Sequence, residues 1–278
     1  MINNKRCDLH IHSNFSDSDA EVETIFKQAK EEGLTCIAVT DHDTLDGMKL
    51  ARTYSDSYGV ELVEGLELSA EHKGVEVHVL AYFVDSENEE LKSELAQVKE
   101  LRIERLLWMA QKLNSLGVEV NIEELFLKIK GAIPTRLHLA LYLLEKGKVK
   151  TLRQAFEKYL SPGKPAYRSR FKYSVEEAIQ FIRKFGGLSF IAHPHVIPDQ
   201  SWIEEFISLG VDGLETIYPT MSPAKRLLYK EMAIKFEKLQ SGGSDAHGSY
   251  KKFIKIGEVD VPYAWVEDMK RCLEVKKS

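Results

Sequence analysis

Cysteine is scarce in this sequence. The three cysteines, Cys7, Cys36 and Cys272, are scattered along the chain and form no CxxC pair. Disulfide frameworks and zinc ribbons both need sets of suitably spaced cysteines, so neither is indicated. This cysteine usage fits a protein of the reducing cytoplasm.

Long apolar runs are also missing. No stretch is long enough to span a bilayer. The first residues, MINNKRCDLH, lack the apolar core of a signal peptide. We therefore expect a cytoplasmic protein with no membrane partner.

Net positive charge is lacking too, because the formal charge is -5 at pH 7. This argues against a broad polyanion-binding surface, and so against long duplex nucleic acid, although it leaves room for a local basic patch. The composition, 44% hydrophobic and 29% charged, is typical of a globular protein with a full core. The 278 residues can form one large α/β domain or a domain with a substantial insertion.

Short apolar segments alternate with helical patterns along most of the chain. Apolar residues at helical spacing predict a helix over residues 22–29, which Gly33 can end. The strand candidates are CIAV (36–39), VELV (60–63), VEVHVLAYFV (75–84), LSFIA (188–192) and GLETI (213–217). This alternation favours a parallel sheet, either open or closed as a barrel.

A helical segment interrupts the alternation. Between residues 88 and 116 leucine, valine and methionine recur at helical spacing, and further helical stretches follow as far as the turn SPGKPAY. We therefore predict an α/β domain in two parts, residues 1–89 and 166–278, with a helical insertion over residues 90–165. The apolar stripes of the insertion are explained by packing alone.

Histidines and carboxylates follow or line the predicted strands. They are His10, His12, His42, Glu67, His78, His193, Asp245 and His247. Taken singly, a histidine after a strand is usually a hydrogen-bonded loop residue, His78 could be a core histidine and Asp245 a turn residue. Their joint occurrence, without a cysteine, favours a metal site, because the loops at one end of a parallel barrel converge. Mixed histidine and carboxylate ligands suit zinc, manganese or iron, and several together suit a multinuclear hydrolytic site.

The motifs DLHIHSNFSDSD, AVTDHDT, EGLELS, VHVLAYFVD, GGLSFIAHPH and GGSDAHG occur in this order. As a set they resemble the PHP (polymerase and histidinol phosphatase) superfamily, and within it the TrpH-like or YciV-like branch. The resemblance covers nearly the whole chain, including the helical insertion. It implies an α/β fold: a distorted (β/α)7 barrel with an inserted helical subdomain and a trinuclear metal centre in its mouth.

The resemblance also implies roles for single residues. His10, His12, Glu67 and Asp245 would hold one divalent ion; Glu67 would bridge to a second, held also by His78 and His193; Asp17, His42 and His247 would hold the third. The three ions would be manganese, iron or zinc. Glu67, Asp245 and His193 are the candidate catalytic residues, with a metal-activated hydroxide as the nucleophile. Arg136 would bind substrate phosphate, with His138 and His195, and less strongly Lys164 and Arg168, as further candidates.

The implied activity is hydrolysis of phosphate esters of nucleotides. Nucleoside 3′,5′-bisphosphates, monophosphates and short RNA degraded in the 5′→3′ direction are the implied substrates. Two alternatives are kept: a histidinol-phosphate phosphatase of the same superfamily, and a metal-binding regulatory module without catalysis. The Asp17 position and the EGLELS block count against the first, and the complete set of nine ligand positions counts against the second.

Overall fold

The strands form one barrel-like sheet. The computed structural model describes residues 5–169 and 172–277. In this part of the chain the sheet order is β8-β7-β6-β4-β3-β2-β1-β9, and β5 pairs with β3. The bounds are β1 Arg6–Ile11, β2 Cys36–Val39, β3 Glu61–His72, β4 Val75–Tyr82, β5 Tyr173–Ser174, β6 Leu188–Ile191, β7 Gly213–Ile217, β8 Leu239–Gly242 and β9 Val261–Pro262.

The segment after β8 closes the sheet against β1. The Asp245 N–H donates to the His10 carbonyl at 2.7 Å, and the His12 N–H donates to the Ala246 carbonyl at 3.0 Å. A Cβ on Gly243 would lie 2.4 Å from the backbone nitrogen of His10, so this close approach requires glycine. The expected barrel-like α/β fold is therefore confirmed.

The direction of β4 differs from the parallel arrangement that the alternation favoured. β4 runs antiparallel to both β3 and β6, and β9 runs antiparallel to β1. The reason is a tight hairpin between β3 and β4. Lys73 and Gly74 have φ of 50° and 81°, as a two-residue hairpin turn of this kind requires. The hairpin extends β3 beyond the barrel mouth.

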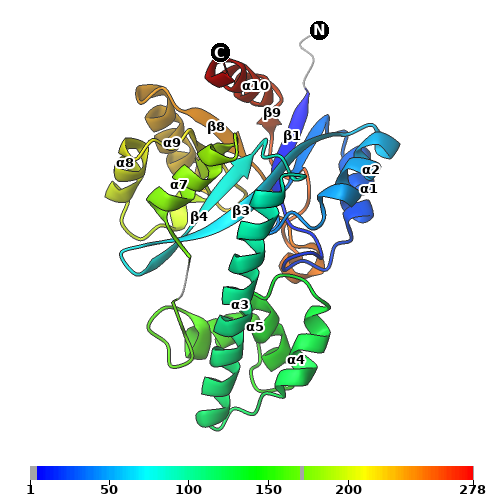
Figure 1. Cartoon of the computed structure of the whole chain (residues 1–278), viewed down its shortest axis with the longest axis vertical. Coiled ribbons are helices and arrows are strands. Elements are labelled where there is room, and N and C mark those ends of the chain that lie inside the picture. The colour runs from blue at the N-terminus through cyan, green and yellow to red at the C-terminus, as the bar shows by residue number, and fades with distance from the viewer. Residues whose placement is uncertain (1–4, 170–171, 278) are drawn as a thin grey trace.

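Helices surround the barrel (Figure 1). They are α1 Val22–Glu31, α2 Met48–Tyr58, α7 Val175–Lys184, α8 Ser201–Ser208, α9 Pro223–Lys235 and α10 Ala264–Lys277. The helix expected over residues 22–29 is confirmed, and its apolar face is buried. Leu9, Ala38, Leu80 and Phe190 fill the barrel interior. α10 packs at the end of the barrel opposite the insertion, as Figure 1 shows.

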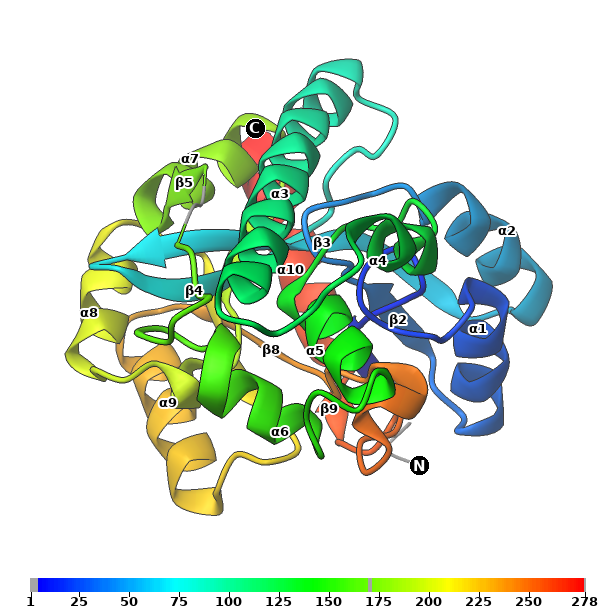
Figure 2. The same cartoon turned by 90° about the horizontal axis from the view of Figure 1, so that it is seen from below.

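The inserted helices have a core of their own. They are α3 Glu89–Ser115, α4 Ile122–Ile129, α5 Arg136–Glu145, α6 Leu152–Ala155 and a π-helix over Phe156–Leu160. α3 joins the two parts: Leu91 and Leu95 pack in the core outside the barrel, whereas Met109 and Leu113 pack in the core of the insertion. Seen from below, the insertion lies in front of the barrel strands (Figure 2). The boundaries at residues 90 and 165 stay a prediction.

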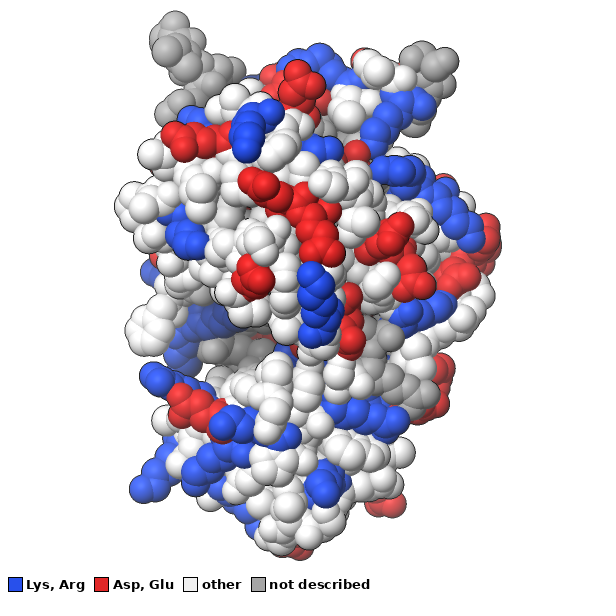
Figure 3. All heavy atoms as spheres, turned by 90° about the vertical axis from the view of Figure 1, so that its left-hand side faces the viewer, with Lys and Arg blue, Asp and Glu red and all other residues white. Residues whose placement is uncertain are grey.

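Charge is distributed unevenly on one face of the molecule. Figure 3 shows acidic side chains mainly on the barrel, whereas Lys and Arg gather on the insertion below a hollow. No helix in the described ranges combines the length and the apolar character that crossing a membrane requires.

Candidate metal centre

The structure brings all nine predicted ligands together at the end of the barrel that faces the insertion. β1, β3 and β4 carry His10, Glu67 and His78, and loops that follow strands carry the other six. Most of the nine are buried, whereas His78 and His193 are partly exposed. His78 lies within a strand rather than at its end. Because β4 is antiparallel, its first half lies at the barrel end where the parallel strands finish.

Glu67 lies at the centre of the cluster. Its two carboxylate oxygens face different sets of histidines. Oε2 lies 3.4 Å from His10 Nε2, 3.2 Å from His12 Nε2 and 3.2 Å from His42 Nδ1, and Oε1 lies 2.9 Å from both His78 Nδ1 and His193 Nε2. A carboxylate with ligands gathered at each oxygen has the geometry of a bridge between two ions.

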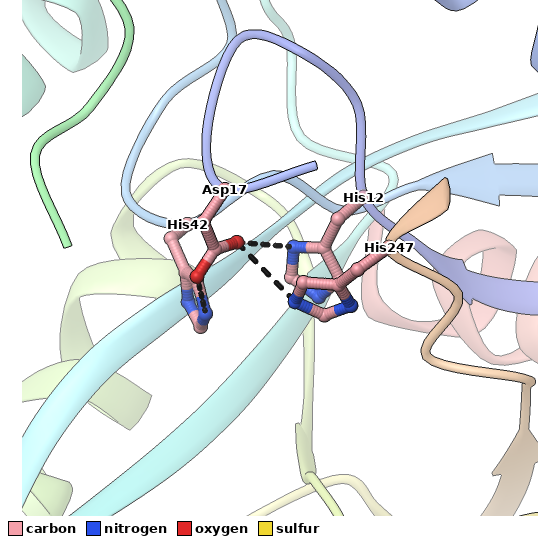
Figure 4. Close-up of side chains that lie close together, drawn as sticks. All are labelled: His12, Asp17, His42 and His247. Carbon is pink, nitrogen blue, oxygen red and sulfur yellow. Dashed lines mark ion pairs between the residues drawn. The ribbon is translucent and has the colours of Figure 1, made fainter. Parts of the chain in front are cut away.

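Asp17 organises a second group of side chains. Its carboxylate lies between His42 on one side and His12 and His247 on the other (Figure 4). The distances are 3.3 Å to His247 Nε2 and 3.7 Å to both His12 Nδ1 and His42 Nε2. Asp245 completes the cluster, with Oδ1 3.1 Å from His12 Nε2. Its Oδ2 accepts hydrogen bonds from Tyr218 and Lys251.

The donor set fits divalent metal ions. The described residues contain three groups whose ligand atoms lie within 4.8 Å of one another: His12, Asp17, His42 and His247; His10, His12 and Glu67; and His42, Glu67 and His78. His10 Nε2, His12 Nε2 and His42 Nδ1 are buried and lack a well-formed hydrogen bond. Buried imidazole nitrogens that converge on carboxylates without such bonds are what ion binding would explain.

Protons and metal ions compete for this cluster. Burial alone would raise the pKa of Glu67, but His78 and His42 outweigh it and hold that pKa well below its usual range. Burial opposes protonation of His12, yet Asp245 and Glu67 raise its pKa to about 9. The same balance, with Glu67 and Glu76 as partners, raises the pKa of His78 to about 10. Ion binding needs neutral imidazoles, so it would release protons.

Glu215 supports two of the histidines, and the sequence reasoning did not identify it. This fully buried residue of β7 has Oε1 3.0 Å from His10 Nδ1, and Oε2 accepts the His193 backbone N–H at 2.5 Å. A carboxylate behind a ligand histidine fixes its tautomer and orientation. The available signal was a glutamate in the middle of the predicted strand GLETI, where a charged side chain is unexpected.

Two aspartates beside His42 tie loops together. Asp41 accepts hydrogen bonds from the backbone and hydroxyl groups of Ser13 and from Ser16. Asp43 accepts from the Ser69 backbone at 2.7 Å and pairs with Arg102. Through these contacts they hold the β1–α1 loop and join α3 to the barrel.

A cationic cavity adjoins the cluster. Its volume is about 230 Å³, and Asp17, His42, His78 and His247 form part of its wall. The wall also contains four cationic residues, Arg102, Arg105, Arg136 and Lys251, together with the carboxylate of Glu76. The sequence analysis proposed only Arg136 among these four. The others were missed because arginines on a helix, and lysines in a loop, usually mark solvated surface.

Arg136 is held in the cavity wall by Glu76. The two side chains form an ion pair, and Glu76 also lies 3.3 Å from His78 Nε2 and 3.7 Å from Arg105 Nη2. The three cations around it hold the pKa of Glu76 well below its usual range, despite the opposing effect of burial. Glu76 therefore links the cationic wall to the ligand cluster.

The other proposed substrate-binding residues do not line this cavity. His138 Nδ1 accepts the Thr135 backbone N–H at 3.1 Å, and its side chain lines a different cleft with Ser16. His195 packs against Tyr218, with ring centroids 4.8 Å apart. Lys164 is exposed on the insertion, and the Arg168 guanidinium lies over the Trp108 ring. A substrate role for these four residues stays a prediction.

Comparison with known proteins identifies the family. The PHP domain matches residues 8–161. The chain is 30% identical over 248 residues to a 5′-3′ exoribonuclease of Haemophilus influenzae, covering 87% of this chain and 90% of the relative. It is 28% identical to a phosphoribosyl 1,2-cyclic phosphate 1,2-diphosphodiesterase of Eggerthella lenta, covering 90% and 97%. It is 29% identical to a 3′,5′-nucleoside bisphosphate phosphatase of Chromobacterium violaceum, covering 86% of each.

A solved structure agrees with these relatives. A Bifidobacterium adolescentis protein, provisionally described as a metal-dependent phosphoesterase, superposes with a TM-score of 0.87 at 28% identity, covering 97% of this chain and 96% of that one. Fold and site thus define a hydrolase of phosphate esters. The chain belongs to the PHP domain family, as its motifs predicted.

Proposed function

We propose that this chain hydrolyses phosphate esters of nucleotides, with nucleoside 3′,5′-bisphosphates and short 5′-phosphorylated RNA as its substrates. The observation that supports this proposal is the cationic wall beside the ligand cluster. A substrate with two anionic groups can place one phosphate at the cluster and the other against this wall.

The ligand cluster would hold divalent ions, three by the assignment from the resemblance, with manganese, iron or zinc as candidates. When bound, such ions activate water and neutralise phosphate charge. The protein side chains have separate tasks. Glu67 would bridge two ions, Asp245 and His193 would complete their shells, and Arg136 would orient the phosphate.

Arg136→Ala tests the cationic wall. Loss of one charge-assisted contact, about 1.5–3 kcal/mol, should lower kcat/KM for a nucleoside bisphosphate about tenfold or more. A contact made only with the bound substrate would raise KM, whereas one that strengthens in the transition state would lower kcat. Arg153→Ala, an exposed arginine of the same insertion, is the control. Equal kinetics of both variants would remove Arg136 from the substrate site.

Substrate choice tests the proposal itself. Histidinol phosphate carries a cationic amine at the end remote from its phosphate, and Arg102, Arg105, Arg136 and Lys251 would repel it. We therefore expect kcat/KM for adenosine 3′,5′-bisphosphate to exceed that for histidinol phosphate by about tenfold or more. Both substrates are to be measured on one manganese-loaded preparation. A preference for histidinol phosphate would overturn the nucleotide assignment.

A further inference from the structure

Positive charge is concentrated in one segment of the insertion. Between residues 146 and 168 the only acidic residue is Glu157. The basic residues of this range are Lys146, Lys148, Lys150, Arg153, Lys158, Lys164 and Arg168. We call residues 146–168 the basic segment. Because the whole chain has a net charge of -5, this local excess is a feature of the segment and not of the composition.

The basic segment borders the substrate cavity near its middle. Phe156 lines the cavity, and the Arg136 guanidinium lies 5.9 Å from the Phe156 ring centroid and 5.6 Å from that of Tyr167. At the end of the basic segment, the Arg168 carbonyl accepts a hydrogen bond from Arg105 Nε at 2.7 Å. Cationic and aromatic side chains therefore lie side by side where the basic segment borders the cavity.

Three lysines of the segment are available to an external anion. Lys150, Lys158 and Lys164 are exposed, and within the described residues none of them has a carboxylate at ion-pair distance. This distinguishes them from Lys146, which pairs with Glu124 at 2.6 Å, and from Arg153, which pairs with Glu157 at 2.6 Å. Figure 3 shows how few acidic side chains accompany the Lys and Arg side chains on this face of the insertion.

We propose that the basic segment binds the backbone of a single-stranded RNA whose 5′-terminal nucleotide occupies the cavity. Lys158 and Lys164 contact phosphates downstream of the scissile one, and the partly exposed rings of Phe156, Tyr159 and Tyr167 offer stacking surfaces for bases. Single-stranded nucleic acid is bound in this manner by cations that follow the backbone and aromatic rings that stack on bases. The inference rests on the proposed function and adds to it a preference for substrates longer than one nucleotide.

The test compares one short and one long substrate. The variant Lys158→Ala/Lys164→Ala is assayed on adenosine 3′,5′-bisphosphate and on a 5′-phosphorylated oligoadenylate of about eight nucleotides, a length within single-strand site sizes. Lys27→Ala/Lys230→Ala is the matched control, because both residues are exposed lysines on helices of the barrel. We expect kcat/KM of the first variant to fall several-fold on the oligonucleotide and to stay within about twofold of wild type on the bisphosphate. The control should match wild type on both substrates.

Salt dependence supplies a second readout. Each phosphate contact on a single strand contributes about 0.7 to the slope of log affinity against log salt. Loss of two contacts lowers that slope by about 1.4, so between about 50 and 200 mM salt the wild type loses about sevenfold more oligonucleotide affinity than the variant. Equal effects on both substrates, or an unchanged slope, would overturn the RNA surface. So would hydrolysis of the bisphosphate by wild type without hydrolysis of the oligonucleotide. Absence of bisphosphate hydrolysis by wild type would instead overturn the proposed function.

Discussion

Glu67→Ala should lower kcat about a thousandfold or more and reduce the metal content of the protein. Both oxygens of Glu67 are surrounded by histidine nitrogens at 2.9–3.4 Å. Without the carboxylate, two ions would lose a shared anionic ligand and repel each other more strongly. Stabilisation of transition-state charge by metal ions is worth several kcal/mol, and about 4 kcal/mol corresponds to about a thousandfold in rate.

The experiment measures hydrolysis of an aryl phosphate together with bound metal by elemental analysis. Glu71→Ala is a suitable control. Glu71 is a glutamate of the same strand, four residues along, and its side chain bonds Ser169 outside the cluster. It should keep metal and activity within about twofold of wild type. Full metal content and turnover in Glu67→Ala would show that the ligand assignment is wrong.

Glu215→Gln should weaken metal binding about 10- to 100-fold, the usual effect of removing a carboxylate behind ligand histidines. Glu215 touches no substrate atom, so it acts by positioning His10 and His193. Glutamine keeps the shape but has one acceptor oxygen in place of two. Its NH2 group would face either the His10 ring nitrogen or the His193 N–H.

Metal affinity is measured by competition with a chelator, and kcat is measured at saturating metal. Asp212→Asn is the matched control, since Asp212 accepts the Ser189 backbone N–H at 2.9 Å, just before β7 and away from the cluster. It should lower the unfolding midpoint without changing metal affinity. If Glu215→Gln and Asp212→Asn behave alike, Glu215 has only a structural role.

The ligand cluster could be predicted because several of its residues stand in recognisable patterns of neighbouring positions in the sequence. His10 and His12 alternate on an extended segment, and Asp245 and His247 have the same spacing. They follow Gly243, where the backbone of His10 comes too close for any side chain. Such patterns survive in a single sequence because strand geometry fixes which side chains share a face.

Residues that depend on long-range contacts could not be predicted in this way. Arg102 and Arg105 are buried because α3 crosses the barrel mouth and brings them to Asp43 and Glu76. The helical periodicity of α3 predicts a helix but does not indicate that the helix packs against the barrel mouth. The direction of β4 was missed because strand alternation was weighed above the turn at Lys73 and Gly74, whose left-handed backbone forms a hairpin.

The closure of β1 against the segment after β8 has a consequence for biosynthesis. His10 and His12 leave the ribosome first, but Asp245 and His247 follow more than two hundred residues later. A nascent chain that ends before Asp245 lacks both these ligands and the hydrogen bonds that close the barrel. Ions that bind only the complete ligand cluster would therefore stabilise the folded barrel by mass action. They would not stabilise the incomplete nascent chain. Metal acquisition would then be the last step of maturation, and its failure would leave the two ends of the polypeptide joined only by hydrogen bonds and apolar packing.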